Sequence, residues 1–216
     1  MIRLHHCAQA RSFRILWLLE EIGLDYMLVR HSFFDRSLRA PAFLALSPAG
    51  RVPALEIDGR VMFESGAITE WLCETRAPHL GRAAWDPERA DYLEWLHYAE
   101  TIGQHLAVLT QQHIVLREDW MRSPTVMRLE AVRLEKALAG AMARRTGDWL
   151  LSGFSAVDVA LGYGALLARR FIAPDAVPGL ADYCARLQAR PAWRRALEQD
   201  GPAELYTRDH YAPPEA

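Results

Sequence analysis

The stretch SPAGRVPALEIDGRVMFESGAITEWL, residues 47–72, sets the fold of the first part of the chain. Two short apolar runs within it are joined by Asp58 and Gly59, and Asp-Gly is the favoured two-residue connection of a β-hairpin. Pro53 has no N–H, so it belongs at the first residue or the edge of a strand. Val52 before it is therefore extended, and its backbone N–H and C=O can pair with a molecule outside the chain. The sequence thus predicts a hairpin whose first strand begins at an open backbone position.

The elements around this hairpin define two domains. Apolar periodicity and turn residues predict the order β-α-β-α-β-β-α. The elements lie at residues 1–6, 11–24, 25–31 and 36–47, then at 54–63, which holds both strands of the hairpin, and at 65–76. After a linker marked by Pro78, Gly81 and Pro87, only helices are expected, at about 88–119, 124–145, 155–170 and 180–199. The prediction is a small α/β domain over residues 1–77 and an all-helical domain over residues 87–216.

The composition excludes several classes of function. The 216 residues are 51% hydrophobic and 24% charged with a formal net charge of -2, and the basic residues do not gather in a run, which argues against a nucleic-acid partner. No segment approaches the roughly 20 apolar residues of a membrane span, and the first residues lack the apolar core of a signal peptide. Three cysteines, odd in number and far apart, favour a reduced, cytoplasmic setting. The adjacent His5 and His6 make no metal motif.

Ser155 and Asp158 mark the start of a helix in the second domain. Their spacing fits a reciprocal cap, in which each side chain satisfies an N–H at the other's position. We interpret both residues as folding signals without a catalytic role.

The order of elements, the Val52-Pro53 strand start, the Glu64-Ser65 helix start, and the Ser155 cap after GDWLLSG together resemble a cytosolic glutathione transferase over nearly the whole chain. The resemblance implies a thioredoxin-like N-terminal domain joined to an all-α C-terminal domain. It also implies a homodimer that uses glutathione as co-substrate and conjugates it to a small hydrophobic electrophile, in a detoxification role, with peroxidase activity as a possible addition.

The resemblance also assigns a glutathione site. In this family the Val-Pro bond is cis, so Val52 and Pro53 would present the valine backbone to the cysteinyl part of glutathione, as in strand addition. A helix N-terminus with the Ser65 hydroxyl suits the γ-glutamyl carboxylate, and Glu64 suits the ammonium beside it. Arg51 is the nearest cation for the glycyl carboxylate. Arg36 and Arg39 are its rivals.

The family takes a hydroxyl or thiol from the loop after the first strand, here HHCAQARSFR, residues 5–14. Aligned with the zeta-class pattern SSCSWR, Ser12 and Arg14 match the last Ser and Arg, whereas the earlier serines fall on Gln9 and Ala10. Ser12 is therefore the predicted catalytic residue, supported by positive charge in the same turn.

Two alternatives to Ser12 stay open in that loop: the amide of Gln9, and Cys7 acting through a mixed disulfide. On the long helix of the second domain, His97 and Gln104 fall where a partner subunit could help to hold glutathione. The sequence also leaves two other functions open, a glutathione-binding regulatory protein without chemistry and a maleylacetoacetate-type isomerase.

Overall fold

The computed structural model describes residues 1–173 and 175–212, and these form two compact units. The first unit contains Met1–Ala83 together with Ala189–Leu205, and the second contains Ala84–Gln188 and the described residues from Tyr206 onward. The sequence divided the chain once, at the linker. The structure instead packs the segment Ala189–Leu205 with the first unit, because its helix contacts side chains near the N-terminus.

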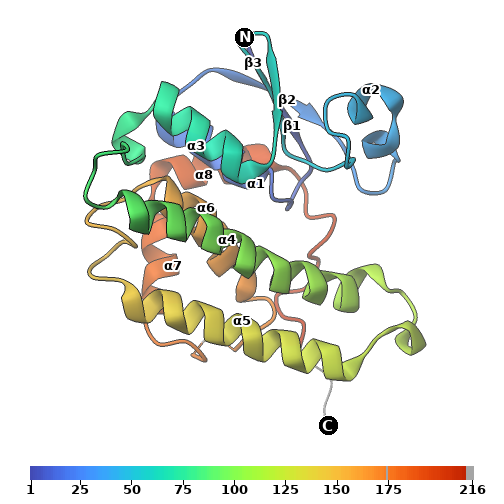
Figure 1. Cartoon of the computed structure of the whole chain (residues 1–216). Helices are drawn as coiled ribbons and strands as arrows, with labels where there is room; N and C mark the ends of the chain where they lie inside the picture. The colour runs from blue at the N-terminus through green and yellow to red at the C-terminus, as the bar shows by residue number, and fades with distance from the viewer. Residues whose placement is uncertain (174, 213–216) are drawn as a thin grey trace. The chain divides into compact units, whose positions relative to one another are not determined.

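A mixed four-stranded sheet with the order β2-β1-β3-β4 forms the centre of the first unit (Figure 1). β1, Ile2–His6, pairs in parallel with β2, Tyr26–Arg30, and antiparallel with β3, Ala54–Ile57. β3 pairs antiparallel with β4, Arg60–Phe63. Asp58 and Gly59 turn the hairpin with φ values of 51° and 74°, the left-handed region that an Asp-Gly connection accepts. The predicted hairpin and the thioredoxin-like fold class are confirmed.

Helices of the first unit come from both ends of the sequence. They are α1 (Phe13–Ile22), α2 (Pro41–Leu44), α3 (Ser65–Thr75) and α8 (Pro191–Asp200), with 3-10 turns at Ser37–Arg39 and Pro78–Leu80. The Trp193 ring meets the Trp17 ring edge to face at 4.9 Å between centroids. Two ion pairs join the same helices, Arg190 Nε to Glu21 Oε1 at 2.6 Å and Arg195 Nε to Glu20 Oε2 at 2.7 Å. α8 is thereby fixed against α1.

The second unit consists of α4 (Arg89–Thr110), α5 (Pro124–Arg144), α6 (Ala156–Ala168) and α7 (Leu180–Ala189). The helix predicted to run to residue 119 ends at Thr110, and a π-helical turn follows at Gln111–Val115. Arg122 donates to the carbonyls of Leu116, at 2.9 Å, and of Arg117, at 3.2 Å. Leu116, directly after the π-helical turn, has an extended backbone with a ψ of 111°, so the chain leaves the helical path there and Arg122 binds the carbonyls of the loop that follows.

The start of α6 has the predicted reciprocal cap. The Asp158 side chain is fully buried and accepts the Ser155 N–H at 3.0 Å, the Leu150 N–H at 3.0 Å and the Tyr183 hydroxyl at 3.0 Å. Burial raises the pKa of Asp158 to about 6, although these donors act in the opposite direction. The predicted cap between Ser155 and Asp158 is confirmed.

Among the described residues, no helix combines the length and the apolar character needed to cross a bilayer. The same residues contain no group of three or more His, Cys, Asp or Glu side chains arranged to hold a metal ion.

Candidate functional site

The conformation of the loop before β3, which contains Arg51 and Val52, is held by a hydroxyl and a glycine. The Ser47 hydroxyl donates to the Arg51 carbonyl at 2.7 Å and accepts the Arg51 N–H at 3.4 Å. Gly50 has a φ of 63°, and a Cβ added there would lie 2.9 Å from the Leu38 carbonyl oxygen, so only glycine fits. The Val52-Pro53 bond is cis, as expected from the resemblance. Val52 is half-buried at the start of the strand, against a small apolar cluster.

The N-terminus of α3 places opposite charges close together. Glu64, at the N-cap with a φ of 69°, has an exposed side chain, whereas Ser65 in the first turn is 6% exposed. Arg14 from α1 is 2% exposed, and its Nη1 donates to Ser65 Oγ at 3.3 Å. A buried guanidinium thus adds positive charge to the free N–H groups of this helix end. Sequence reasoning predicts Glu64 and Ser65 as site residues but not the contact from Arg14, which is 51 residues away from Ser65.

The three cations proposed for the glycyl carboxylate all have exposed side chains. Arg51 lies directly before Val52, while Arg36 and Arg39 belong to the segment around the 3-10 turn Ser37–Arg39. Arg36 has a φ of 65°. All three side chains are exposed to solvent, and Arg51 is the nearest of them in sequence to the start of β3.

Ser12, the predicted catalytic residue, is 0% exposed. Its Oγ lies 2.9 Å from His6 Nδ1, accepts the Cys7 N–H at 3.3 Å and lies 3.4 Å from the Cys7 carbonyl oxygen. The hydroxyl therefore points into the unit. The loop would have to move for this hydroxyl to touch a ligand sulfur.

The two alternatives in the loop are also held by the protein. Cys7 is 1% exposed, and burial, followed by the charges of Glu204 and Asp35, raises the pKa of its thiol to about 12. A thiolate at Cys7 is therefore strongly disfavoured. Gln9 accepts the Leu205 N–H through Oε1 at 2.9 Å, so its side-chain amide is engaged within the protein.

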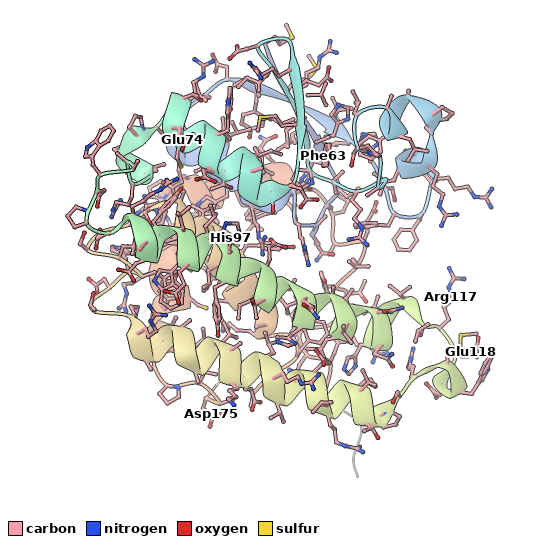
Figure 2. All side chains as sticks on the ribbon, in the orientation of Figure 1. Phe63, Glu74, His97, Arg117, Glu118 and Asp175 are labelled. Atoms are coloured by element: carbon pink, nitrogen blue, oxygen red, sulfur yellow. The ribbon has the colours of Figure 1, made fainter. Side chains whose placement is uncertain are left out.

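His97 and Gln104 lie on α4 of the second unit with exposed side chains, and Figure 2 labels His97. Their neighbour His105 is engaged within the same unit, with Nδ1 2.7 Å from Glu130 Oε2.

Comparisons with known proteins find similarity to glutathione S-transferases. The family described as "Glutathione S-transferase, N-terminal domain" matches residues 10–75. Glutathione S-transferase 3 of Schizosaccharomyces pombe is 37% identical over 101 residues, which are 46% of this chain and 41% of that protein. A glutathione S-transferase of Hyoscyamus muticus is 27% identical over 210 residues, covering 91% of this chain and 98% of that protein. The solved theta class glutathione S-transferase of Xanthomonas axonopodis pv. citri, with glutathione bound, has a TM-score of 0.81 at 25% identity, over 91% of this chain and 96% of that chain.

The fold is thus that of a thioredoxin-like domain followed by helices; residues 10–75 match the N-terminal domain of glutathione S-transferases, and over most of its length the chain is similar to proteins of that name. The chain spans less than half of the fission-yeast relative, and nearly the full length of the plant relative.

Proposed function

We propose that this protein is a glutathione transferase that joins glutathione, its co-substrate, to small hydrophobic electrophiles. The residues proposed to bind glutathione are Arg51, Val52, Pro53, Glu64 and Ser65. The residues present suit the tripeptide: an open strand start for its peptide backbone, cations for its glycyl end, and a helix N-terminus for its γ-glutamyl end.

The observation that carries the proposal is the start of α3. An anion there meets the N–H groups of the first turn, the Ser65 hydroxyl and the buried charge of Arg14, which donates to that hydroxyl at 3.3 Å. The exposed Glu64 next to it supplies the opposite charge. The γ-glutamyl end of glutathione presents a carboxylate and an ammonium on one carbon, so both of its charges find a partner within one helical turn.

Conjugation also requires a thiolate. A free thiol has a pKa of about 8.5, and lowering it by about two requires roughly 2.7 kcal/mol of preferential stabilisation of the anion. Cys7 cannot share this task, since burial keeps it protonated. We propose that Ser12 contributes by holding the loop, because its hydroxyl contacts His6 and Cys7. The positive N-terminus of α1 then acts on the sulfur.

Calorimetric titration with glutathione tests the site. Glu64→Ala should weaken binding by about 1–3 kcal/mol, the cost of leaving a charged partner unmatched. Glu74→Ala, at the far end of the same helix (Figure 2), removes an equal charge and should leave the affinity unchanged. Equal affinities of wild type and Glu64→Ala would remove the site assignment.

A second candidate is a glutathione-binding protein without conjugating activity. The burial of Ser12 and the protonated state of Cys7 favour it, because neither side chain offers a donor or a nucleophile at the surface. Turnover with a panel of electrophiles, a hydroperoxide and maleylacetoacetate separates these functions. Binding with no turnover on any of them supports the second candidate, and turnover of maleylacetoacetate alone supports an isomerase.

We further propose a cytoplasmic location. All three cysteines are free and buried, which suits a reducing compartment.

A further inference from the structure

Three buried side chains form a polar chain beneath the loop between β1 and α1. His6, at the end of β1, is 0% exposed; its Nε2 lies 3.0 Å from Asp200 Oδ1 and its Nδ1 lies 2.9 Å from Ser12 Oγ. An ionised carboxylate only accepts hydrogen bonds, so Nε2–H donates to Asp200. The other ring nitrogen, Nδ1, is thereby turned towards the Ser12 hydroxyl. Asp200 thus orients the ring that Ser12 contacts.

The same carboxylate holds the loop through its backbone. Asp200 is 5% exposed, and the Gln9 N–H donates to both of its oxygens, at 3.2 Å and 3.1 Å. Gln9 itself has a φ of 59°, a conformation in which a side-chain-bearing residue needs support from its surroundings. Its Oε1 also accepts the Leu205 N–H at 2.9 Å. Residues at and beyond the end of α8 therefore fix the middle of the loop.

The end of α8 is in turn tied to the sheet. Arg30, the last residue of β2, donates from Nη1 to the Asp200 carbonyl at 3.1 Å and from Nη2 to the Gln199 carbonyl at 2.7 Å. Gly201 turns the chain away with a φ of 103°, and a Cβ there would lie 3.1 Å from Arg30 Nη1. Asp200 is thus placed by contacts with the sheet as well as by its own helix.

We propose that Asp200 and His6 are positioning residues for the thiol end of glutathione. They act through Ser12 and the Gln9 backbone, and they keep the loop in the conformation that favours the thiolate. This inference rests on the proposed function, because it assumes that the tripeptide binds with its sulfur beside this loop.

The sign of one measurement separates positioning from simple electrostatics. Removing a negative charge near a thiolate stabilises the anion, so charge loss alone would lower the pKa of the bound thiol. Loss of positioning removes stabilisation of the thiolate and acts in the opposite direction. For Asp200→Asn we expect the pH at which half of the bound thiol is ionised to rise by about one unit, a roughly tenfold loss of thiolate at pH 7.

The experiment follows the ultraviolet absorbance of the thiolate in the glutathione complex as a function of pH. Glu198→Gln, an exposed acid on the same helix, removes the same charge and should match the wild type. His6→Gln keeps a donor towards Asp200 but loses the ring nitrogen that contacts Ser12, so its midpoint should rise as well. Circular dichroism and calorimetry show for each variant that it is folded and binds glutathione.

Failure of wild type to bind glutathione in the calorimeter would reject the proposed function. Binding by wild type, with folded Asp200→Asn or His6→Gln keeping or lowering the midpoint, would reject the positioning role alone. If Asp200→Asn does not fold, His6→Gln decides. Should neither fold, Ser12→Ala, which breaks the same chain at its last link, decides by the same criterion.

Discussion

At the scale of single residues, burial sets the protonation state of Cys7, one of the two side chains of the loop that could act on a thiol. Cys7 has a pKa raised to about 12, so it stays a thiol throughout the pH range of an activity assay. We therefore expect Cys7→Ala to keep the conjugation rate and its pH profile. Iodoacetamide at pH 8, followed by mass spectrometry of the native protein, should leave Cys7 unmodified. A glutathione adduct on Cys7, together with loss of activity in Cys7→Ala, would instead define a cysteine-type thiol transferase.

Ser12→Ala tests the other residue. The substitution removes the hydroxyl that contacts His6 Nδ1 at 2.9 Å and releases the start of α1. Because the loop loses this contact, part of the stabilisation of the thiolate should be lost, and the rising limb of the rate profile should move to higher pH by roughly one unit, as for Asp200→Asn. Affinity for glutathione should change little, since the γ-glutamyl and backbone contacts remain. An unchanged profile would mean that Ser12 has no effect on the thiolate and only precedes α1.

The helix start at Glu64 and Ser65 could be predicted from sequence because its signal is local: a polar pair directly after a hairpin. The partners of Ser12 could not. Its hydroxyl points towards His6 and, through that ring, towards Asp200, which is 194 residues further along the chain than His6. No spacing rule in the sequence records such a contact.

At the scale of elements, the cap of α6 has a titratable group at its centre. Asp158 has a folded-state pKa of about 6 against an ordinary value of 3.8, because burial disfavours its charge. A raised folded-state pKa means that the folded state holds the proton more tightly. The stabilisation is complete below pH 4 and is lost as the pH rises through 6, by up to about 3 kcal/mol.

Urea denaturation from pH 4 to pH 7 measures this effect. Asp158→Asn is neutral throughout, so the unfolding free energy of wild type minus that of the variant should fall as the pH rises. Asp182→Asn, an exposed acid in the first turn of α7, is the control for general charge effects. A difference between wild type and Asp158→Asn that stays constant or grows with pH would show that the three hydrogen bonds outweigh burial.

Element boundaries followed the sequence where a local signal fixed them. Gly23 ends α1 with a φ of 76°, and its N–H donates to the Leu19 carbonyl at 2.9 Å. The end of α4 had no such signal. There the chain passes into a π-helical turn at Gln111–Val115 and becomes extended at Leu116, so helical periodicity alone overran the true end.

At the scale of the whole molecule, the sequence could not place α8. Its apolar periodicity predicts a buried face but not the element that buries it. Tertiary contacts select α1 as the partner of α8. The ring of Trp193 packs on α1, and Arg190 and Arg195 pair with the acids at the end of α1. Glu20 and Glu21 lie where the helix dipole disfavours negative charge, and these arginines compensate for it.

The sheet of the first unit has two edges, and their side chains differ. Edge strand β4 exposes Val61 at 45% and Phe63 at 46%, two apolar residues whose spacing places them on one face of the strand; Figure 2 labels Phe63. Edge strand β2 exposes a single large apolar residue, Met27, at 48%. Apolar side chains on a short unpaired edge are features of an association surface. We therefore propose that the homodimer expected for this family uses β4.

Sedimentation equilibrium at micromolar concentration should give the mass of a dimer. Val61→Asp places a charge in the proposed interface, and its dimer dissociation constant should rise at least about tenfold, which corresponds to roughly 1.4 kcal/mol. Met27→Asp introduces the same charge on the opposite edge at nearly equal exposure, so it should sediment as the wild type does. A monomeric wild type would reject the homodimer. If the wild type is a dimer and both substitutions raise its dissociation constant equally, the homodimer stands but the interface is not at β4. An interface at β4 predicts a larger effect of Val61→Asp than of Met27→Asp.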